Sequence, residues 1–119
     1  MFFNKLRVGC FNLLFNFLFA VLTIVLPMFF YERIFFTTFL LLLISISGLM
    51  KWRSSTSLFI FIFGAIFGVA SEIIAIHLGV WSYAVVNFIN VPFWLFLVWG
   101  NASVFIYQTG KEFEKLSIK

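Results

Sequence analysis

Four long apolar stretches follow one another along the chain, and they constrain its fold more than any other feature. They cover approximately residues 11–31, 34–50, 57–79 and 91–109, with short polar segments between them. A helix needs about 20 mostly apolar residues to cross the hydrocarbon core of a membrane, and each stretch is near or above that length. The sequence therefore predicts an all-α integral membrane protein whose single domain, residues 1–119, is an antiparallel bundle of four transmembrane helices.

The composition agrees with a membrane environment and argues against a nucleic-acid partner. Hydrophobic residues make up 64% of the chain, charged residues only 10%, and the mean hydropathy is +1.15. A soluble domain of this length has no core large enough to hide so much apolar surface, whereas lipid accepts it. The net charge of +4 comes from residues placed between the apolar runs, not gathered in one basic patch. We expect a lipid bilayer as partner and no nucleic acid.

Lys and Arg residues fall almost entirely on one side of the predicted bundle. One side has seven basic residues and the other has one, Arg33, beside Glu32. The seven are Lys5, Arg7, Lys51, Arg53, Lys111, Lys115 and Lys119. Short loops rich in Lys and Arg stay in the cytoplasm, so both termini are predicted to be cytoplasmic, and we expect the bacterial inner (cytoplasmic) membrane. The tight segment around residues 31–33 predicts that the first two helices form an antiparallel hairpin.

Glu72 is the most informative residue, because an ionisable side chain inside a membrane span is costly and usually has a role. Small residues share its helical face, which allows a neighbouring helix to approach and turns Glu72 toward the bundle interior. They are Gly64, Gly68, Ala75 and Gly79. Two interpretations stay open. Glu72 is either a general acid or base, that is, a candidate catalytic residue, or it joins two helices through a hydrogen bond.

A ligand pocket is predicted around Glu72 in the outer leaflet. Trp94, Asn101 and Gln108 recur every seven residues and form a stripe on the fourth helix, where Asn101 is expected to hydrogen bond to Glu72. The only histidine, His77, lies about 140° around the helix from Glu72, so no dyad is expected. The predicted lining residues are Ser71, His77, Trp81, Tyr83, Trp94, Trp99 and Asn101.

Motifs of common catalytic and metal sites are missing from the sequence. It contains no phosphate-binding loop, nucleophile elbow, paired carboxylates or Cys/His cluster. The single cysteine, Cys10, has no partner for a disulfide or a zinc site. We therefore predict no metal and no cofactor, and the residues alone do not decide whether the protein is an enzyme.

The segment around Glu72 resembles part of a known group of membrane proteins. The resemblance rests on Glu72-Ile-Ile-Ala-Ile-His-Leu-Gly79, Trp81-Ser-Tyr83, Val91-Pro-Phe-Trp94 and Trp99-Gly100, in that order. This arrangement resembles the polytopic carotenoid-modifying proteins of the hydratase and heterodimeric lycopene-cyclase kind. It implies that Glu72 faces an isoprenoid-like ligand. Phe93 and Trp94 stand where the cyclases have paired acidic residues, so cyclase chemistry is not carried over.

Three functions are compatible with these features. The first is a small membrane protein that binds or modifies a lipid or isoprenoid around Glu72. The second is a non-enzymatic subunit or assembly partner, in a homo-oligomer or a larger membrane complex, in which Gly64 or Gly68 contacts other helices. The third is a small proton-coupled transporter, since the small multidrug transporters have a similar size, a similar number of spans and a membrane Glu, although theirs is on the first helix.

Overall fold

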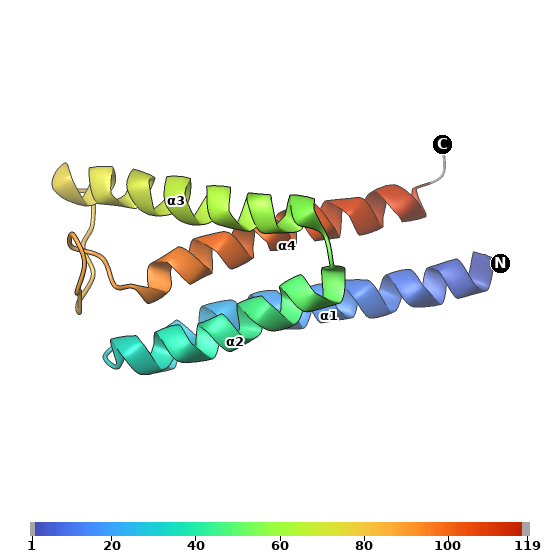
Figure 1. Cartoon of the computed structure of the whole chain (residues 1–119), viewed down its shortest axis with the longest axis horizontal. Helices are drawn as coiled ribbons and strands as arrows, with labels where there is room; N and C mark the ends of the chain where they lie inside the picture. The colour runs from blue at the N-terminus through green and yellow to red at the C-terminus, as the bar shows by residue number, and fades with distance from the viewer. Residues whose placement is uncertain (1, 118–119) are drawn as a thin grey trace.

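The structure is a computed structural model, described here for residues 2–117, and that part of the chain forms four α-helices. They are α1 (Phe2–Phe30), α2 (Ile34–Trp52), α3 (Ser55–His77) and α4 (Trp94–Leu116). The helices lie side by side in an elongated molecule of 52 × 27 × 23 Å (Figure 1). The start of α1 and the end of α4 lie at the same end of the molecule (Figure 1). The predicted all-α fold is confirmed.

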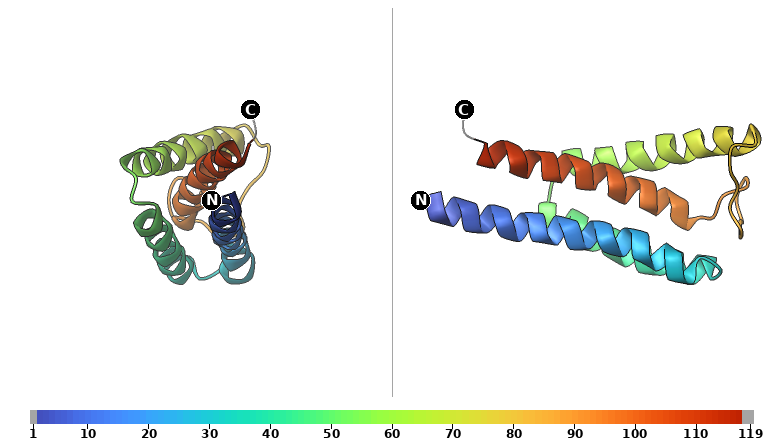
Figure 2. Two further views of the ribbon diagram at one scale, coloured as in Figure 1. Left: turned by 90° about the vertical axis from the view of Figure 1, so that its right-hand side faces the viewer. Right: turned by 180° about the vertical axis from the view of Figure 1, so that it is seen from behind.

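The first and last helices extend further than the apolar stretches that predicted them. α1 begins at Phe2, not near residue 11, and α4 continues to Leu116, beyond residue 109. Lys, Glu and Arg are good helix formers, so a helix continues in water after its apolar part has ended. The charged ends of α1 and α4 project together past the ends of α2 and α3 (Figure 2, right). Lys119, which contributed to the charge asymmetry, lies outside the described residues.

The connections follow from local hydrogen bonding. α1 and α2 form the predicted hairpin, because only residues 31–33 separate them. Between α2 and α3, Arg53 adopts the left-handed conformation and its N–H bonds to the Leu49 carbonyl. The Ser54 side chain then accepts a hydrogen bond of 3.1 Å from the Ser57 N–H, which caps α3. Two residues, 53 and 54, are therefore enough to join α2 to α3.

α3 stops in a glycine-dependent turn that positions the next segment. Gly79 has φ +81°, a conformation that a residue with a Cβ rarely adopts. The Val80 N–H bonds to the Ala75 carbonyl, and the Gly79 N–H bonds to the Ile76 carbonyl, which is the Schellman arrangement. The chain therefore turns sharply after His77, and residues 78–93 fold back over the end of the molecule.

The molecule has an apolar surface and a partly polar interior. Exposed phenylalanines include Phe35, 73% exposed, and Phe59, 69% exposed. Buried polar side chains occur on every helix; they are Asn16, Thr23, Thr37, Ser45, Ser57, Glu72, Asn101, Gln108 and Glu112. This distribution suits a hydrocarbon environment, where exposed apolar groups cost nothing and polar groups need partners inside the protein.

Three of the described helices, α1, α2 and α3, are long and apolar enough to cross a membrane. α4, which contains the predicted fourth span, is not among them. Its polar residues explain the difference: the predicted stripe of Trp94, Asn101 and Gln108 is buried, and Glu112 continues it. α4 packs against all the other helices, and seen end on it lies between α1 and α3 (Figure 2, left).

Candidate functional site

Glu72 lies buried on α3, 7% exposed, and accepts three hydrogen bonds. Its Oε1 accepts from the Tyr83 hydroxyl and, at 3.2 Å, from the Trp81 indole N–H. Its Oε2 accepts from the Trp99 indole N–H on α4. A carboxylate is an acceptor with room for several donors, so one side chain joins α3, the connection after it and α4.

The small face of α3 makes room for this arrangement. A Cβ added to Gly68 would lie 2.1 Å from Cδ2 of Trp99, far inside van der Waals contact. One added to Gly64 would lie 1.9 Å from the Oγ of Ser103. The glycines predicted to permit close packing therefore do so, and both contact α4 of the same chain.

A cavity of about 350 Å³ opens beside Glu72. Its walls come from α1, α3, α4 and the connection before α4; the lining residues are Thr23, Ile24, Pro27, Glu72, Tyr83, Trp94, Leu95, Val98, Trp99 and Ala102. Within the described residues, the buried indole N–H of Trp94 has no hydrogen-bond partner. Proline has no N–H, so Pro27 also leaves the Thr23 carbonyl without its usual helical donor. The cavity wall thus contains a free donor, the Trp94 N–H.

A second cavity of about 280 Å³ continues the first along α1 and α4. The two share four lining residues, Thr23, Ile24, Val98 and Ala102. The second is bounded further along by Ala20, Asn101, Phe105 and Ile106. On α4 the combined groove runs from Trp94 to Ile106, about 18 Å of helix. Its lining is largely apolar, with the polar groups of Glu72, Tyr83 and Trp94 at one end.

The structure brings together only part of the predicted pocket. Trp81, Tyr83 and Trp99 contact Glu72, and Trp94 lines the cavity. Ser71 lies on the exposed side of α3, where its hydroxyl donates to the Gly68 carbonyl at 2.7 Å, and the exposed His77 is also outside both cavities. The helical rotation that separates them from Glu72 explains both positions.

The predicted hydrogen bond between Asn101 and Glu72 is wrong. Asn101 accepts from the Ser45 hydroxyl at 2.7 Å and donates to the Thr23 hydroxyl at 3.1 Å. It therefore joins α4 to α2 and α1, and its remaining link to the site is that it lines the second cavity. Within residues 2–117, the side chains that donate to the Glu72 carboxylate are those of Trp81, Tyr83 and Trp99.

Sequence reasoning missed the contribution of α1, because Thr23 and Pro27 carry no charge and belong to an ordinary apolar stretch. The available signal was a proline inside a helix, one turn after a threonine.

Among residues 2–117, no group of three His, Cys, Asp or Glu side chains could hold a metal ion. No family model, no characterised protein and no solved structure matches the chain.

Burial of the Tyr83 phenol raises its pKa above the ordinary value of 10.0, and the hydrogen bond to Glu72 and the negative charge of Glu72 raise it further. The folded state therefore holds the phenol proton more tightly than the unfolded state. This contribution to stability is present below about pH 10 and is lost as the pH rises beyond it. We expect the free energy of unfolding to fall less above pH 10 in Tyr83→Phe than in the wild type, measured by denaturant titration in detergent. If the free energy of unfolding fell equally steeply with pH in both proteins, the raised pKa of Tyr83 would be contradicted.

Proposed function

We propose that the protein spans the membrane four times, with α4 as an internal span. Polar side chains along the middle of α4 pair with neighbouring helices: Gln108 donates to Ser57 at 2.6 Å, and Thr109 accepts from Asn16 at 3.3 Å. A polar helix crosses a bilayer at acceptable cost when its polar face is enclosed by other helices. The charge asymmetry then places both termini and the turn between α2 and α3 in the cytoplasm, and the Glu72 site near the opposite leaflet.

We infer that the protein binds a lipid or isoprenoid that has a hydroxyl at the end of an apolar chain. The observation that carries this inference is the groove between α1 and α4, with the Glu72 cavity at its polar end. The free Trp94 N–H can donate to the ligand oxygen, and Oε2 of Glu72, which accepts one hydrogen bond, can accept another from the ligand hydroxyl. The apolar residues along α4 then cover the chain of the ligand, as in most small-molecule sites.

Binding explains the geometry around Glu72 better than acid catalysis does. Both carboxylate oxygens already accept hydrogen bonds from phenol or indole groups. A general acid needs a free path from its own proton to the reacting atom, and these donors occupy the same oxygens. We therefore assign Glu72 to holding the polar end of the ligand and to fixing the aromatic residues around it.

Blocking the groove tests this function while leaving the Glu72 hydrogen bonds in place. Ala102 lines both cavities, and a phenylalanine there fills the passage between them. Ala70 is exposed on α3, so Ala70→Phe is a matched control for added bulk. Native mass spectrometry of protein extracted gently from its own membrane should show an apolar adduct of defined mass in the wild type and Ala70→Phe. The adduct should be reduced at least about tenfold in Ala102→Phe, because the ligand loses most of its buried apolar contact.

The same measurement identifies the competing functions. Stoichiometric companion polypeptides without a small adduct would show that the protein is a structural subunit. An adduct retained equally in all three proteins would place the ligand outside the groove and contradict the proposed site.

A further inference from the structure

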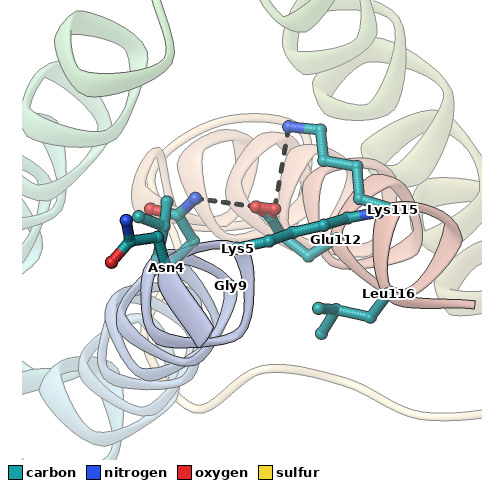
Figure 3. Close-up of a pocket in the computed structure, with 8 residues that line it drawn as sticks. Asn4, Lys5, Gly9, Glu112, Lys115 and Leu116 are labelled. Atoms are coloured by element: carbon teal, nitrogen blue, oxygen red, sulfur yellow. Dashed lines mark hydrogen bonds and ion pairs between the residues drawn. The ribbon is translucent and has the colours of Figure 1, made fainter. Parts of the chain in front are cut away.

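A second carboxyl group is buried at the opposite end of the molecule. Glu112 on α4 is 5% exposed, although it belongs to a charged segment that would ordinarily face water. Two cavities of about 300 and 190 Å³ adjoin it, and both are lined by Asn12, Glu112 and Lys115. Figure 3 shows the larger one between the start of α1 and the end of α4, with Lys5 reaching across from α1.

Two buried oxygen atoms at this site have no hydrogen-bond donor within residues 2–117. Oε1 of Glu112 accepts from Asn12 at 2.7 Å, but Oε2 is 3.8 Å from the Lys115 ammonium, beyond hydrogen-bond distance. Asn16 is 1% exposed and donates through its amide nitrogen, while its Oδ1 lacks a partner. Buried acceptors without donors are costly, so a bound group with N–H donors would stabilise this region.

Lysine side chains place positive charge around the same cavities. Lys5 and Lys115 line the larger cavity, and Lys51, Lys111 and Lys115 line the smaller one. Glu112 is the only acidic residue in either lining, so each lining has a net positive charge. Such a site favours a ligand that combines an anionic part for the lysines with a cationic N–H donor for the acceptors.

The position of the site indicates where this ligand comes from. Lys51, near the end of the apolar helix α2, donates to Asn12 at 2.9 Å, so the site is level with the end of a predicted span. At this level a membrane presents lipid head groups, and lysines are frequent there because their charge reaches water.

We propose that the cavities beside Glu112 bind the phosphoethanolamine head group of a membrane lipid. The ammonium group donates to Oε2 of Glu112 and Oδ1 of Asn16, and the phosphate lies among the lysines. This site is separate from the Glu72 groove and does not depend on the function proposed for it. A choline head group carries the same charges but has no N–H, so it cannot satisfy either acceptor.

The difference between ethanolamine and choline provides the test. The protein is reconstituted into nanodiscs with equal amounts of phosphatidylethanolamine, phosphatidylcholine and phosphatidylglycerol, and retained lipids are identified by native mass spectrometry. We expect about a tenfold preference for the ethanolamine lipid over the choline lipid, the effect of one hydrogen bond to a charged group. Glu112→Gln keeps an acceptor for Asn12 but loses the carboxylate, and should lower this ratio several-fold, with Oδ1 of Asn16 left as the remaining acceptor. Lys115→Gln should lower retention of both phospholipids while preserving the preference.

Equal retention of ethanolamine and choline lipids by the wild type would overturn the proposal. So would a preference for phosphatidylglycerol, which would mean that the lysines alone select the lipid. The ratio of retained ethanolamine lipid to retained choline lipid should be unchanged in Ala102→Phe. The head-group site can therefore be confirmed or rejected whether or not the groove binds its own ligand. Helical content measured by circular dichroism shows that the Glu112 and Lys115 variants are folded.

Discussion

Gly68→Ala should destabilise the protein by about 2 kcal/mol, although alanine favours a helix more than glycine by about 1 kcal/mol. The added methyl group would lie 2.1 to 2.4 Å from three atoms of the Trp99 ring. This ring cannot rotate away without losing its hydrogen bond to Glu72. Unfolding in mixed detergent, followed by circular dichroism, measures the loss, and the red shift of tryptophan fluorescence should begin at a lower denaturant fraction.

Gly110→Ala is the matched control, since a Cβ at Gly110 meets no atom within 4 Å. It should leave stability unchanged or raise it slightly through helix propensity. If Gly68→Ala were as stable as Gly110→Ala, α3 and α4 would not pack as closely as described.

Glu72→Leu should be the most destabilising single substitution, with an expected loss of about 3 kcal/mol or more. It removes the acceptor for three donors at once, and Trp81, Tyr83 and Trp99 cannot all find new partners in an apolar surrounding. The connection of residues 78–93 should then detach from the end of the helices. Amide hydrogen exchange should accelerate most in this segment, and less in α2, which has no contact with Glu72 through these bonds.

Glu114→Leu controls for the loss of a negative charge, because Glu114 is exposed on α4. Its effect should stay within about 0.5 kcal/mol. Uniform acceleration of exchange in Glu72→Leu would indicate global unfolding and would contradict a local role for Glu72 in holding the connection.

Much of the helical framework follows from the sequence. Apolar stretches locate the helices, the short segment at residues 31–33 predicts the hairpin, and the glycine face predicts that Glu72 is buried. These features depend on spacing along one helix or on very short loops, which the order of residues determines directly.

The contacts of the site depend on how the helices are rotated and shifted against one another, and no single stretch of sequence contains that information. Asn101 is at about the right depth for Glu72, yet it faces Thr23 and Ser45, because α4 presents Trp99 to Glu72 instead. Trp81 and Tyr83 reach Glu72 because the turn at Gly79 reverses the chain, and helical periodicity does not predict such a reversal.

The burial of Glu112 also cannot be predicted from the charged segment that contains it. Between Lys111 and Lys115 it looks like an ordinary solvated residue, and its burial depends on α1 extending beyond its apolar part to cover it. A signal was nevertheless present: Asn101, Gln108 and Glu112 follow spacings of seven and four, and so share one face of α4.

The unequal lengths of the helices set a condition on the membrane itself. α2 has 19 residues and is about 28 Å long, whereas α1 has 29 residues and is about 43 Å long. α1 has length to spare in a thicker bilayer, whereas α2 has none and is tied to α4 through Ser45 and Asn101. A lipid layer thicker than about 30 Å would therefore have to thin around α2, at a cost that rises with each ångström of mismatch. Bilayers of short-chain lipids should accommodate the protein best, and lengthening the acyl chains should disfavour its insertion.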